Sequence, residues 1–339
     1  MEHVRVLQDG FWERTAIVRD ATGRLLVRKE STAAGADSPW GRTALREEIR
    51  FLDTVPGLAK NYYPPLVDHW DHSASNGSVG YCIPYYDGYE NVSVALRNGS
   101  LSQADADQIQ CHLADAILEA THQPASPFGI VRHVCDTIED AITRLRKLPD
   151  FASCIDSAEL KINECVMPGL SRAYDRARES PAMQTLGSLP TIRLHGDLIL
   201  ENILWNPAGD PPLRLIDPVS VAGISSGPAA FDLVKYASYA TGELYALRSG
   251  AIKTGPTPGE RDAFTYEPAP LPAFGRIDLL SGFESAFEQR HGPRDKAVEH
   301  LLDGYFSLVM AVNTHGLQQW GRVLKGILSL NAAVETLVT

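Results

Sequence analysis

Apolar and polar residues alternate along two short runs near the N-terminus. Residues 14–20 (RTAIVRD) and 24–30 (RLLVRKE) show this period of two, and the residues that join them end at Gly23. Such alternation is typical of β-strands, and glycine can adopt the positive φ that a tight turn needs. We therefore predict a β-hairpin here, with residues 4–8 (VRVLQ) as a further strand of an antiparallel sheet.

A helix is predicted next, over residues 43–55 (TALREEIRFLDTV). Leu45, Ile49 and Leu52 recur with helical spacing, and Glu48 lies on the same apolar face, where a carboxylate needs a partner. Residues 64–70 and 79–92 then predict two more strands, the second ending at a turn. The result is a small lobe of five antiparallel strands and one helix, to which we assign residues 1–86.

The rest of the chain, residues 87–339, is predicted to be a mainly helical lobe. Apolar stripes with helical spacing mark, among others, residues 108–122 and 134–148. Strand-like segments interrupt the helices around residues 191–220, and the segment rich in proline and glycine at 252–275 is interpreted as a long ordered loop or a lid. The fold class is therefore α+β with two lobes.

Composition narrows the classes of partner. The formal charge of −11 repels the phosphates of nucleic acids and anionic lipids, whereas it attracts cationic small molecules. The N-terminus carries charges where a signal peptide has an apolar core, and no apolar run approaches the ~18 residues of a membrane span. We expect a cytoplasmic protein without nucleic-acid or membrane partners; the oligomeric state is left open.

Neither the cysteines nor the histidines predict a metal centre. The five cysteines form no C-x-x-C pair, so a disulfide framework or a structural zinc site is not indicated. Residues 68–72 (DHWDH) cluster two aspartates and two histidines, but a turn between strands explains this cluster equally well. No metal ligand is assigned there.

The chemistry is concentrated in the interruption of the helical region. His195-Gly196-Asp197 is followed by Asn202, and Leu215-Ile216-Asp217 follows at the end of a predicted strand. Phosphoryl transfer needs a carboxylate that orients or deprotonates the attacking hydroxyl, and oxygen ligands for the Mg²⁺ ions that neutralise the phosphates. Asp197 suits the first role, and Asn202 and Asp217 suit the second.

These motifs resemble the aminoglycoside phosphotransferase and choline kinase family, whose catalytic loop reads H-G-D-x-x-x-x-N. The resemblance extends to Asp217-Pro218 and to residues 227–233 (GPAAFDL), where it implies that Asp232 braces the catalytic loop. It implies a protein-kinase-like fold and transfer of a γ-phosphoryl group from ATP, with Mg²⁺; GTP is not excluded. Two stretches depart from the pattern, the loop at residues 8–14 with its single glycine and residues 199–201 (ILE) in the catalytic loop.

In the small lobe, the resemblance implies an ion pair between Lys29 and Glu48 that positions the phosphates of ATP. Glu47 is the alternative partner of Lys29, although it lies to one side of the apolar helix face. The strand and hinge that would hydrogen-bond adenine correspond to residues 83–86, with Ile83, Pro84 and Tyr86 as the expected contacts.

Two other classes of function remain open on the sequence. Residues 223–227 (GISSG) match the G-x-S-x-G elbow of serine hydrolases, with Ser225 as nucleophile, although such an enzyme would need a parallel sheet before the elbow. A binding-only pseudokinase is the second, since the loop at residues 8–14 lacks the usual glycines. The presence of Lys29, Asp197, Asn202 and Asp217 argues against it.

The substrate is only broadly defined as a small molecule with a hydroxyl group. Glu201 near the catalytic loop and Glu243 after Asp232 would suit a cationic or multiply hydroxylated ligand. We favour an antibiotic as the substrate, modified by O-phosphorylation, over metabolic alcohols of the choline, homoserine or sugar type.

Overall fold

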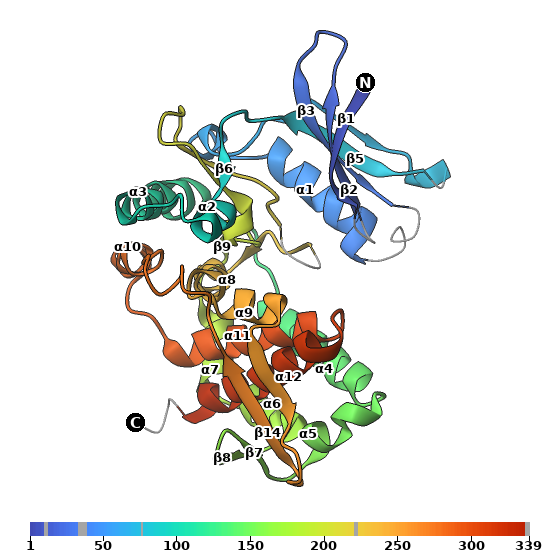
Figure 1. Cartoon of the computed structure of the whole chain (residues 1–339), viewed down its shortest axis with the longest axis vertical. Helices are drawn as coiled ribbons and strands as arrows, with labels where there is room; N and C mark the ends of the chain where they lie inside the picture. The colour runs from blue at the N-terminus through green and yellow to red at the C-terminus, as the bar shows by residue number, and fades with distance from the viewer. Residues whose placement is uncertain (10–12, 33–38, 76, 220–222, 336–339) are drawn as a thin grey trace. The chain divides into compact units, whose positions relative to one another are not determined.

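The computed structural model describes residues 1–9, 13–32, 39–75, 77–219 and 223–335. Packing divides the chain into two compact units, Met1–Ala125 with Ile192–Gly227, and Ser126–Thr191 with Pro228–Thr339. The α+β class is confirmed, because an antiparallel five-stranded sheet comes first and helices dominate the C-terminal part (Figure 1). The division after residue 86 into a nucleotide-binding and a catalytic lobe stays a prediction.

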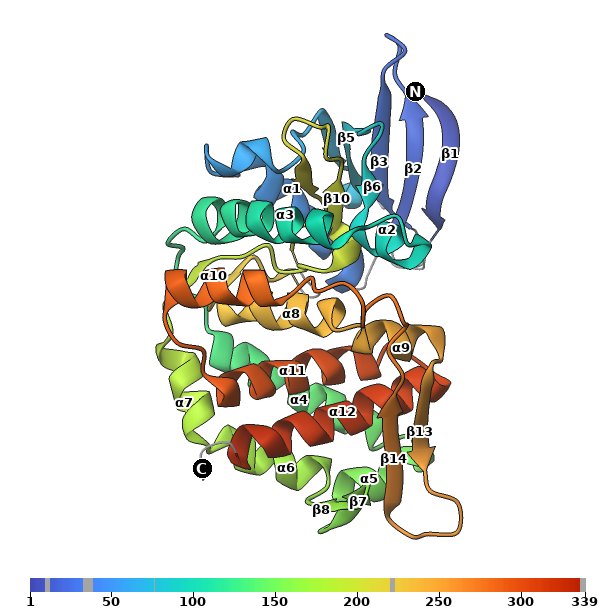
Figure 2. The ribbon, with the colours of Figure 1, turned by 60° about the vertical axis from the view of Figure 1, so that its left-hand side comes forward.

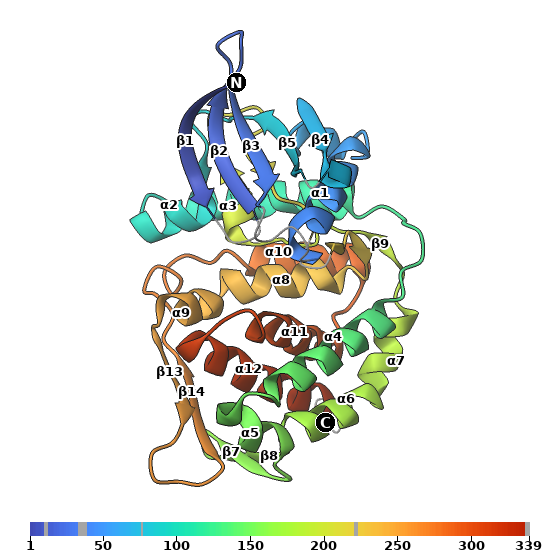
Figure 3. The same ribbon diagram turned by 90° about the vertical axis from the view of Figure 1, so that its right-hand side faces the viewer.

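The sheet of the first unit has the strand order β1-β2-β3-β5-β4, and its strands lie side by side in Figure 3. They are β1 (Glu2–Asp9), β2 (Glu13–Arg19), β3 (Leu25–Ser31), β4 (Asp68–Asp71) and β5 (Val79–Pro84). The hairpin predicted around Gly23 is present, with φ of +87° at this glycine. The strand predicted over residues 64–70 is present as β4, whereas the interpretation of residues 68–72 as a turn was wrong, because residues 68–71 each pair with a residue of β5.

Opposite faces of β3 carry different chemistry because side chains alternate along a strand. Leu26 packs with Val18 and Cys82 in a small apolar cluster on one face. Lys29 projects to the other face, where helix α1 (Ala44–Asp53) buries Leu45 and Glu48. The sequence pattern therefore places the ammonium group of Lys29 and the carboxylate of Glu48 in the same buried layer.

The remainder of the first unit contains the segment with the candidate chemistry. Its short strands are β6 (Glu90–Asn91), β9 (Ile192–Arg193), β10 (Ile203–Trp205), β11 (Leu213–Leu215) and β12 (Ser226–Gly227). Its further helices are α2 (Val92–Asn98) and α3 (Gln103–Ala114), the second beginning with a capping box between Ser102 and Asp105. Strands β10 and β11 pair antiparallel and position the two ends of the predicted catalytic segment.

The second unit is built on helices. They are α4 (Ile130–Leu145), α5 (Ala152–Asp156), α6 (Leu170–Arg178), α7 (Pro181–Ser188), α8 (Ala230–Ala240), α9 (Glu243–Ser249), α10 (Ser281–His291), α11 (Lys296–Ala311) and α12 (Gly316–Glu335). Figure 2 shows α11 and α12 running along each other. A Cβ added at Gly304 or Gly326 would lie 3.0 or 2.8 Å from leucine side chains of the facing helix, so glycine permits this close approach.

The segment 252–275 was expected to be a long loop or a lid, and this was wrong. Strands β13 (Ile252–Pro256) and β14 (Ala263–Pro268) form an antiparallel hairpin in a four-stranded sheet with β7 (Leu160–Ile162) and β8 (Cys165–Met167). Residues 263–266 (AFTY) supply β-formers that bury Phe264 and Tyr266, while the prolines and glycines lie mostly in and beyond the turn. The hairpin is visible beside α12 in Figure 2.

Among the residues that the structure describes, no helix combines the length and the apolar composition needed to cross a bilayer.

Candidate functional site

The predicted catalytic loop folds as a compact turn between β9 and β10. Gly196 has φ of +83°, a conformation that favours glycine, and Leu200–Asn202 form a single 3₁₀ turn. His195 is fully buried, and its Nδ1 accepts a hydrogen bond from the backbone N–H of Asp197 at 3.2 Å. The histidine therefore supports the turn from inside and leaves the half-buried Asp197 beyond it.

Asn202 connects three parts of this segment through its side-chain amide. Its Nδ2 donates to the backbone oxygen of Asp197 at 2.9 Å and to the carboxylate Oδ2 of Asp197 at 3.1 Å. A longer contact of 3.5 Å reaches the backbone oxygen of Asp217. The Oδ1 atom of Asn202 has no hydrogen-bond donor within the described part of the chain, so the oxygen remains available for another ligand.

The backbone around Asp217 is unusual. Asp217 has φ of +49° and Val219 has φ of +80°, which is rare outside glycine and rarest for β-branched residues. Two backbone hydrogen bonds hold this segment against the catalytic loop, from Ile216 N to Asn202 O at 3.0 Å and from Val219 N to His195 O at 2.5 Å. Strained conformations of this kind cost about 1–3 kcal/mol each and concentrate at functional sites.

Lys29 lies at the centre of a group of carboxylates. Its Nζ lies 3.1 and 3.0 Å from the two carboxylate oxygens of Glu48, 3.3 Å from Glu13 Oε1 and 3.4 Å from Asp217 Oδ1. The hydroxyl of Tyr81 donates to Glu48 Oε2 at 2.7 Å. The geometry joins Lys29 to Glu48 as its helical partner and joins both to the end of the segment that carries Asp217.

Glu47 is not the helical partner of Lys29. Its carboxylate accepts two hydrogen bonds from Nη1 of Arg50, at 2.7 and 2.8 Å, on the exposed side of α1. Glu48 faces inward because it shares the buried side of α1 with Leu45, Phe51 and Leu52.

Burial and charge act in opposite directions on this group. Burial favours the neutral amine of Lys29, but the carboxylates of Asp217 and Glu48 hold its pKa well above the ordinary value. Burial raises the pKa of Glu48, although the Lys29 ammonium opposes the change. Burial also raises the pKa of Glu13, and the charges of Asp217 and Asp197 add to that increase. The site thus has an excess of negative charge around one ammonium.

The donor set is compatible with Mg²⁺ bound together with phosphates. Asp217 is 39% exposed at its side chain, and the free Oδ1 of Asn202 is the kind of oxygen ligand that Mg²⁺ accepts. No group of three histidine, cysteine or acidic side chains within the described residues is arranged to hold a metal ion by itself. Mg²⁺ usually takes only one or two carboxylates and completes its shell with water and phosphate oxygens, so this pair of ligands fits.

The residues predicted to contact adenine lie at and beyond the end of β5. Ile83 is buried opposite Val27, Pro84 ends the strand opposite Leu26, and Tyr86 follows in a half-buried position. The guanidinium of Arg214 lies 4.3 Å from the centre of the Tyr86 ring. This stacking fixes the Tyr86 ring on β11 of the same unit.

The remaining predicted residues lie in different surroundings. Glu201 is half-buried in the catalytic loop, and its backbone oxygen accepts a hydrogen bond from the Asn91 side chain. Asp232 is fully buried at the start of α8. Glu243 pairs with Lys325 at 2.5 Å, accepts a hydrogen bond from Tyr266 at 2.5 Å, and lines a hollow of about 200 Å³. The charge of Glu243 is therefore already offset by a buried lysine.

Within the described residues, the surroundings of Ser225 are not those of a hydrolase nucleophile. Its backbone oxygen accepts a hydrogen bond from Leu194 N, and the next two residues form β12, which pairs antiparallel with β9. A nucleophile elbow instead connects a strand of a parallel sheet directly to a helix.

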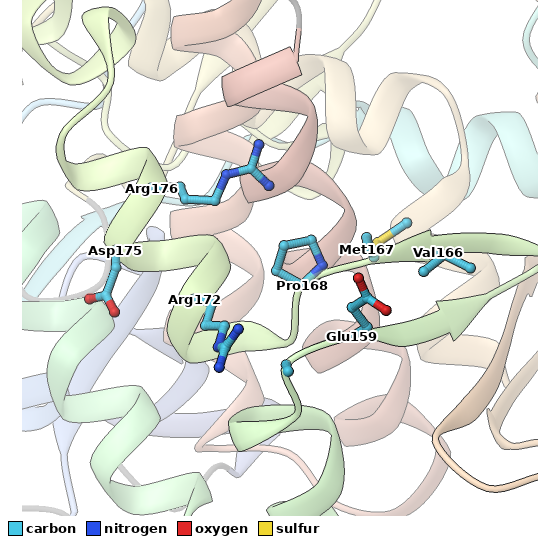
Figure 4. Close-up of a pocket in the computed structure, with 8 residues that line it drawn as sticks. Glu159, Val166, Met167, Pro168, Arg172, Asp175 and Arg176 are labelled. Carbon is cyan, nitrogen blue, oxygen red and sulfur yellow. The ribbon is translucent and has the colours of Figure 1, made fainter.

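A separate hollow of about 460 Å³ lies in the second unit, between β8 and α6 (Figure 4). Arg172 and Arg176 line it one helical turn apart, together with Glu159 and the apolar Val166 and Met167. None of the residues predicted from the sequence to act in catalysis or binding lines this hollow.

Sequence reasoning missed three residues of the site: Glu13, Tyr81 and Arg214. Lys29 is paired with Tyr81 across β3 and β5, and with Thr15 across β2 and β3, which places Glu13 on the same face two residues away. These neighbours depend on the register between strands. A turn length can suggest the register of a hairpin, but the β3–β5 pairing has no such local signal.

The phosphotransferase enzyme family matches residues 3–264 of the chain. No curated protein matches it by sequence. The fold resembles that of the GDP and kanamycin complex of APH(2")-IIia, with a TM-score of 0.56 and 15% identity over 99% of this chain and 95% of the other.

Two further solved structures are similar. A candidate fructosamine-3-kinase from Thermobifida fusca has a TM-score of 0.55 and 16% identity, covering 98% of this chain and 94% of its own. The GDP complex of wild-type aminoglycoside 2'-phosphotransferase-IIIa has a TM-score of 0.50 and 15% identity, covering 98% and 92%. At these identities the structures establish the shared fold.

Proposed function

Since the chain belongs to the phosphotransferase enzyme family and is a small-molecule kinase, we propose that it transfers the γ-phosphoryl group of ATP to a hydroxyl group of an antibiotic. One observation carries the assignment of the site. The Lys29 ammonium lies 3.0 Å from Glu48 and 3.4 Å from Asp217, and Asn202 joins the segment of Asp217 to the carboxylate of Asp197. These contacts support our proposal that one connected group of side chains binds the phosphates, binds the metal and activates the hydroxyl.

Each residue has a distinct proposed role. Lys29, held by Glu48, contacts the phosphates, and the backbone of residues 83–86 with the Tyr86 ring receives the adenine. Asn202 Oδ1 and the Asp217 carboxylate would hold Mg²⁺, which neutralises charge on the phosphates during transfer. Asp197 accepts or orients the proton of the attacking hydroxyl, while the hydrogen bond from Asn202 keeps its carboxylate in place. Asp232 is proposed to brace the catalytic loop.

The proposed substrate is a cationic, multiply hydroxylated antibiotic. Support comes from the net charge of −11, from Glu201 beside the catalytic loop, and from the similarity to a fold that binds kanamycin. Glu243 contributes less than its charge suggests, because Lys325 already neutralises it. A sugar amine or metabolic alcohol is the second candidate, favoured by the equally similar candidate fructosamine-3-kinase.

The test is an ADP-release assay with Mg²⁺ and ATP against a panel of aminoglycosides, macrolides, fructosamines, choline and homoserine, with GTP run beside ATP. We expect turnover with at least one aminoglycoside, and none in the Asp197→Asn variant. Turnover confined to fructosamines or to metabolic alcohols would replace the antibiotic by the second candidate. Nucleotide binding without turnover on any acceptor would instead support a binding-only protein, and labelling of Ser225 by a serine-reactive probe would support a hydrolase.

A further inference from the structure

Glu13 is an acidic residue at the phosphate-binding lysine to which the proposed chemistry gives no role. It begins β2, its side chain is 21% exposed, and its Oε1 lies 3.3 Å from Lys29 Nζ. Within the described residues, Lys29 is the single ion-pair partner of Glu13. The residue therefore lies against the one ammonium group of the site through a single contact.

The other two carboxylates at Lys29 are held more firmly. Glu48 makes two contacts to Lys29, accepts a hydrogen bond from Tyr81 and projects from a helix. Asp217 lies in the strained segment that is hydrogen-bonded to the catalytic loop. Glu13 and Asp217 each lose one contact when they leave Lys29, but the backbone on both sides of Asp217 is fixed by hydrogen bonds to the catalytic loop.

Once a nucleotide is bound, the Lys29 ammonium group cannot donate hydrogen bonds to all the acceptors around it. An ammonium group has three donors, and Glu48, Glu13 and Asp217 already occupy its surroundings at 3.0–3.4 Å. A phosphate oxygen that approaches Lys29 must take the place of one acceptor, and a nearby carboxylate left in position would repel it.

Resting on the function proposed above, we propose that Glu13 is an internal competitor of the nucleotide: its carboxylate occupies the phosphate position at Lys29 and is displaced when a nucleoside di- or triphosphate binds. The competition lowers affinity for free nucleotide. It also makes productive binding depend on a divalent cation, because the cation offsets the repulsion between Glu13 and the phosphates. Glu13 therefore makes the site bind the metal-bound nucleotide in preference to the free nucleotide.

The test compares nucleotide binding by wild type and Glu13→Gln, using calorimetric titration of adenosine, ADP and ATP in EDTA and again with Mg²⁺. In EDTA, Glu13→Gln should bind ADP and ATP about tenfold or more tightly than wild type, whereas adenosine should change by less than about twofold. With Mg²⁺ the gain should shrink. Glu13→Asp, which keeps the charge, should stay closer to wild type than Glu13→Gln.

Two controls separate this mechanism from a structural effect. Glu30→Gln removes a carboxylate that pairs with Arg28 on the opposite face of the same sheet, and it should leave all three affinities unchanged. In the Lys29→Met background, the gain from Glu13→Gln should be smaller, because the competition for the ammonium is gone and only the repulsion between the carboxylate and the phosphates remains.

Three outcomes would overturn the inference. Weaker binding of ADP and ATP by Glu13→Gln would make Glu13 a positive contributor to the site, and a parallel gain for adenosine would indicate a general change in the fold. Unchanged affinities would show that Glu13 does not compete. If wild type binds nucleotide, each of these three outcomes leaves the proposed kinase function intact. If wild type binds no nucleotide, either in EDTA or with Mg²⁺, both the inference about Glu13 and the proposed function are wrong.

Discussion

Replacing Lys29 by methionine should destabilise the first unit in a way that depends on pH. Lys29 and Glu48 are 6% and 7% exposed at their side chains, so the variant leaves Glu48 buried without its counter-charge. Breaking a buried ion pair from one side typically costs about 3–5 kcal/mol. Glu48 can limit this cost by taking up a proton. Protonating a carboxyl group of ordinary pKa 4.5 at pH 7 costs about 3 kcal/mol, because each pH unit above the pKa adds about 1.4 kcal/mol.

The sign of the pH effect follows from which state binds the proton. In Lys29→Met the folded state holds a proton on Glu48 that the unfolded state releases above pH 4.5, so folding takes up a proton. The stability of Lys29→Met should therefore fall as pH rises from about 4.5 to 7, by up to about 1.4 kcal/mol per pH unit, and at least as steeply as that of wild type, in which the Lys29 ammonium opposes the rise in the pKa of Glu48. The double variant Lys29→Met/Glu48→Gln, with a neutral amide, should recover most of the loss and show a smaller slope, because Glu13, whose pKa burial also raises, remains.

The measurement is urea unfolding without nucleotide or metal, at several pH values, followed by tryptophan fluorescence. Hydrogen exchange over β3 and α1 assigns the change to the first unit. Lys60→Met, at an exposed lysine of that unit, is the matched control. A Lys29→Met protein as stable as wild type, or a double variant no more stable than the single one, would refute the electrostatic reasoning.

Three further predictions concern the metal, the nucleotide and the second unit. Asp217→Asn should lose most Mg²⁺-dependent turnover while its melting temperature stays near that of wild type; retained turnover would place the metal elsewhere. ATP with Mg²⁺ at a hundred times its Kd should stabilise the protein by about 2.7 kcal/mol in a thermal-shift assay, and no shift would count against nucleotide binding. Lys325→Met removes the ion-pair partner of Glu243 and Asp303 and should lower the free energy of unfolding, measured with urea, by about 3 kcal/mol. Replacing both acids by amides in this variant should restore the stability. A Lys325→Met protein as stable as wild type would contradict the prediction.

Local sequence patterns accounted for much of the fold. The alternation in residues 14–30 and the stripe through Leu45 and Leu52 specify the hairpin and α1, because each pattern matches one backbone period. The hairpin at 252–268 was missed because its prolines and glycines outweighed the strand signal of Phe264 and Tyr266. Its stability comes from burial against the rest of the second unit, which a local pattern does not reveal.

The candidate site likewise contains residues that the sequence predicted and residues that it did not. The sequence alone predicted Asp197, Asn202 and Asp217, because these residues lie within one continuous segment with a characteristic spacing. The choice of Glu48 over Glu47 also followed from the helix face and agrees with the ion pair to Lys29. Glu13 was missed because the sequence pattern assigned it to the loop at residues 8–14, whereas it begins β2 and shares a face of the hairpin with Lys29. The predicted loop at residues 8–14 includes residues 10–12, which lie outside the described part of the chain.

The central claim is that Asp197 acts on the substrate hydroxyl in the transition state of phosphoryl transfer. Single-turnover transfer from ATP by Asp197→Asn, on whichever acceptor the panel identifies, tests it most directly, with Asp53→Asn at an exposed site as the matched control. The account predicts a loss of about 10²- to 10⁴-fold in the rate of transfer, with little change in the Kd for ATP. Near-normal transfer by Asp197→Asn, beside an unaffected control, would contradict it.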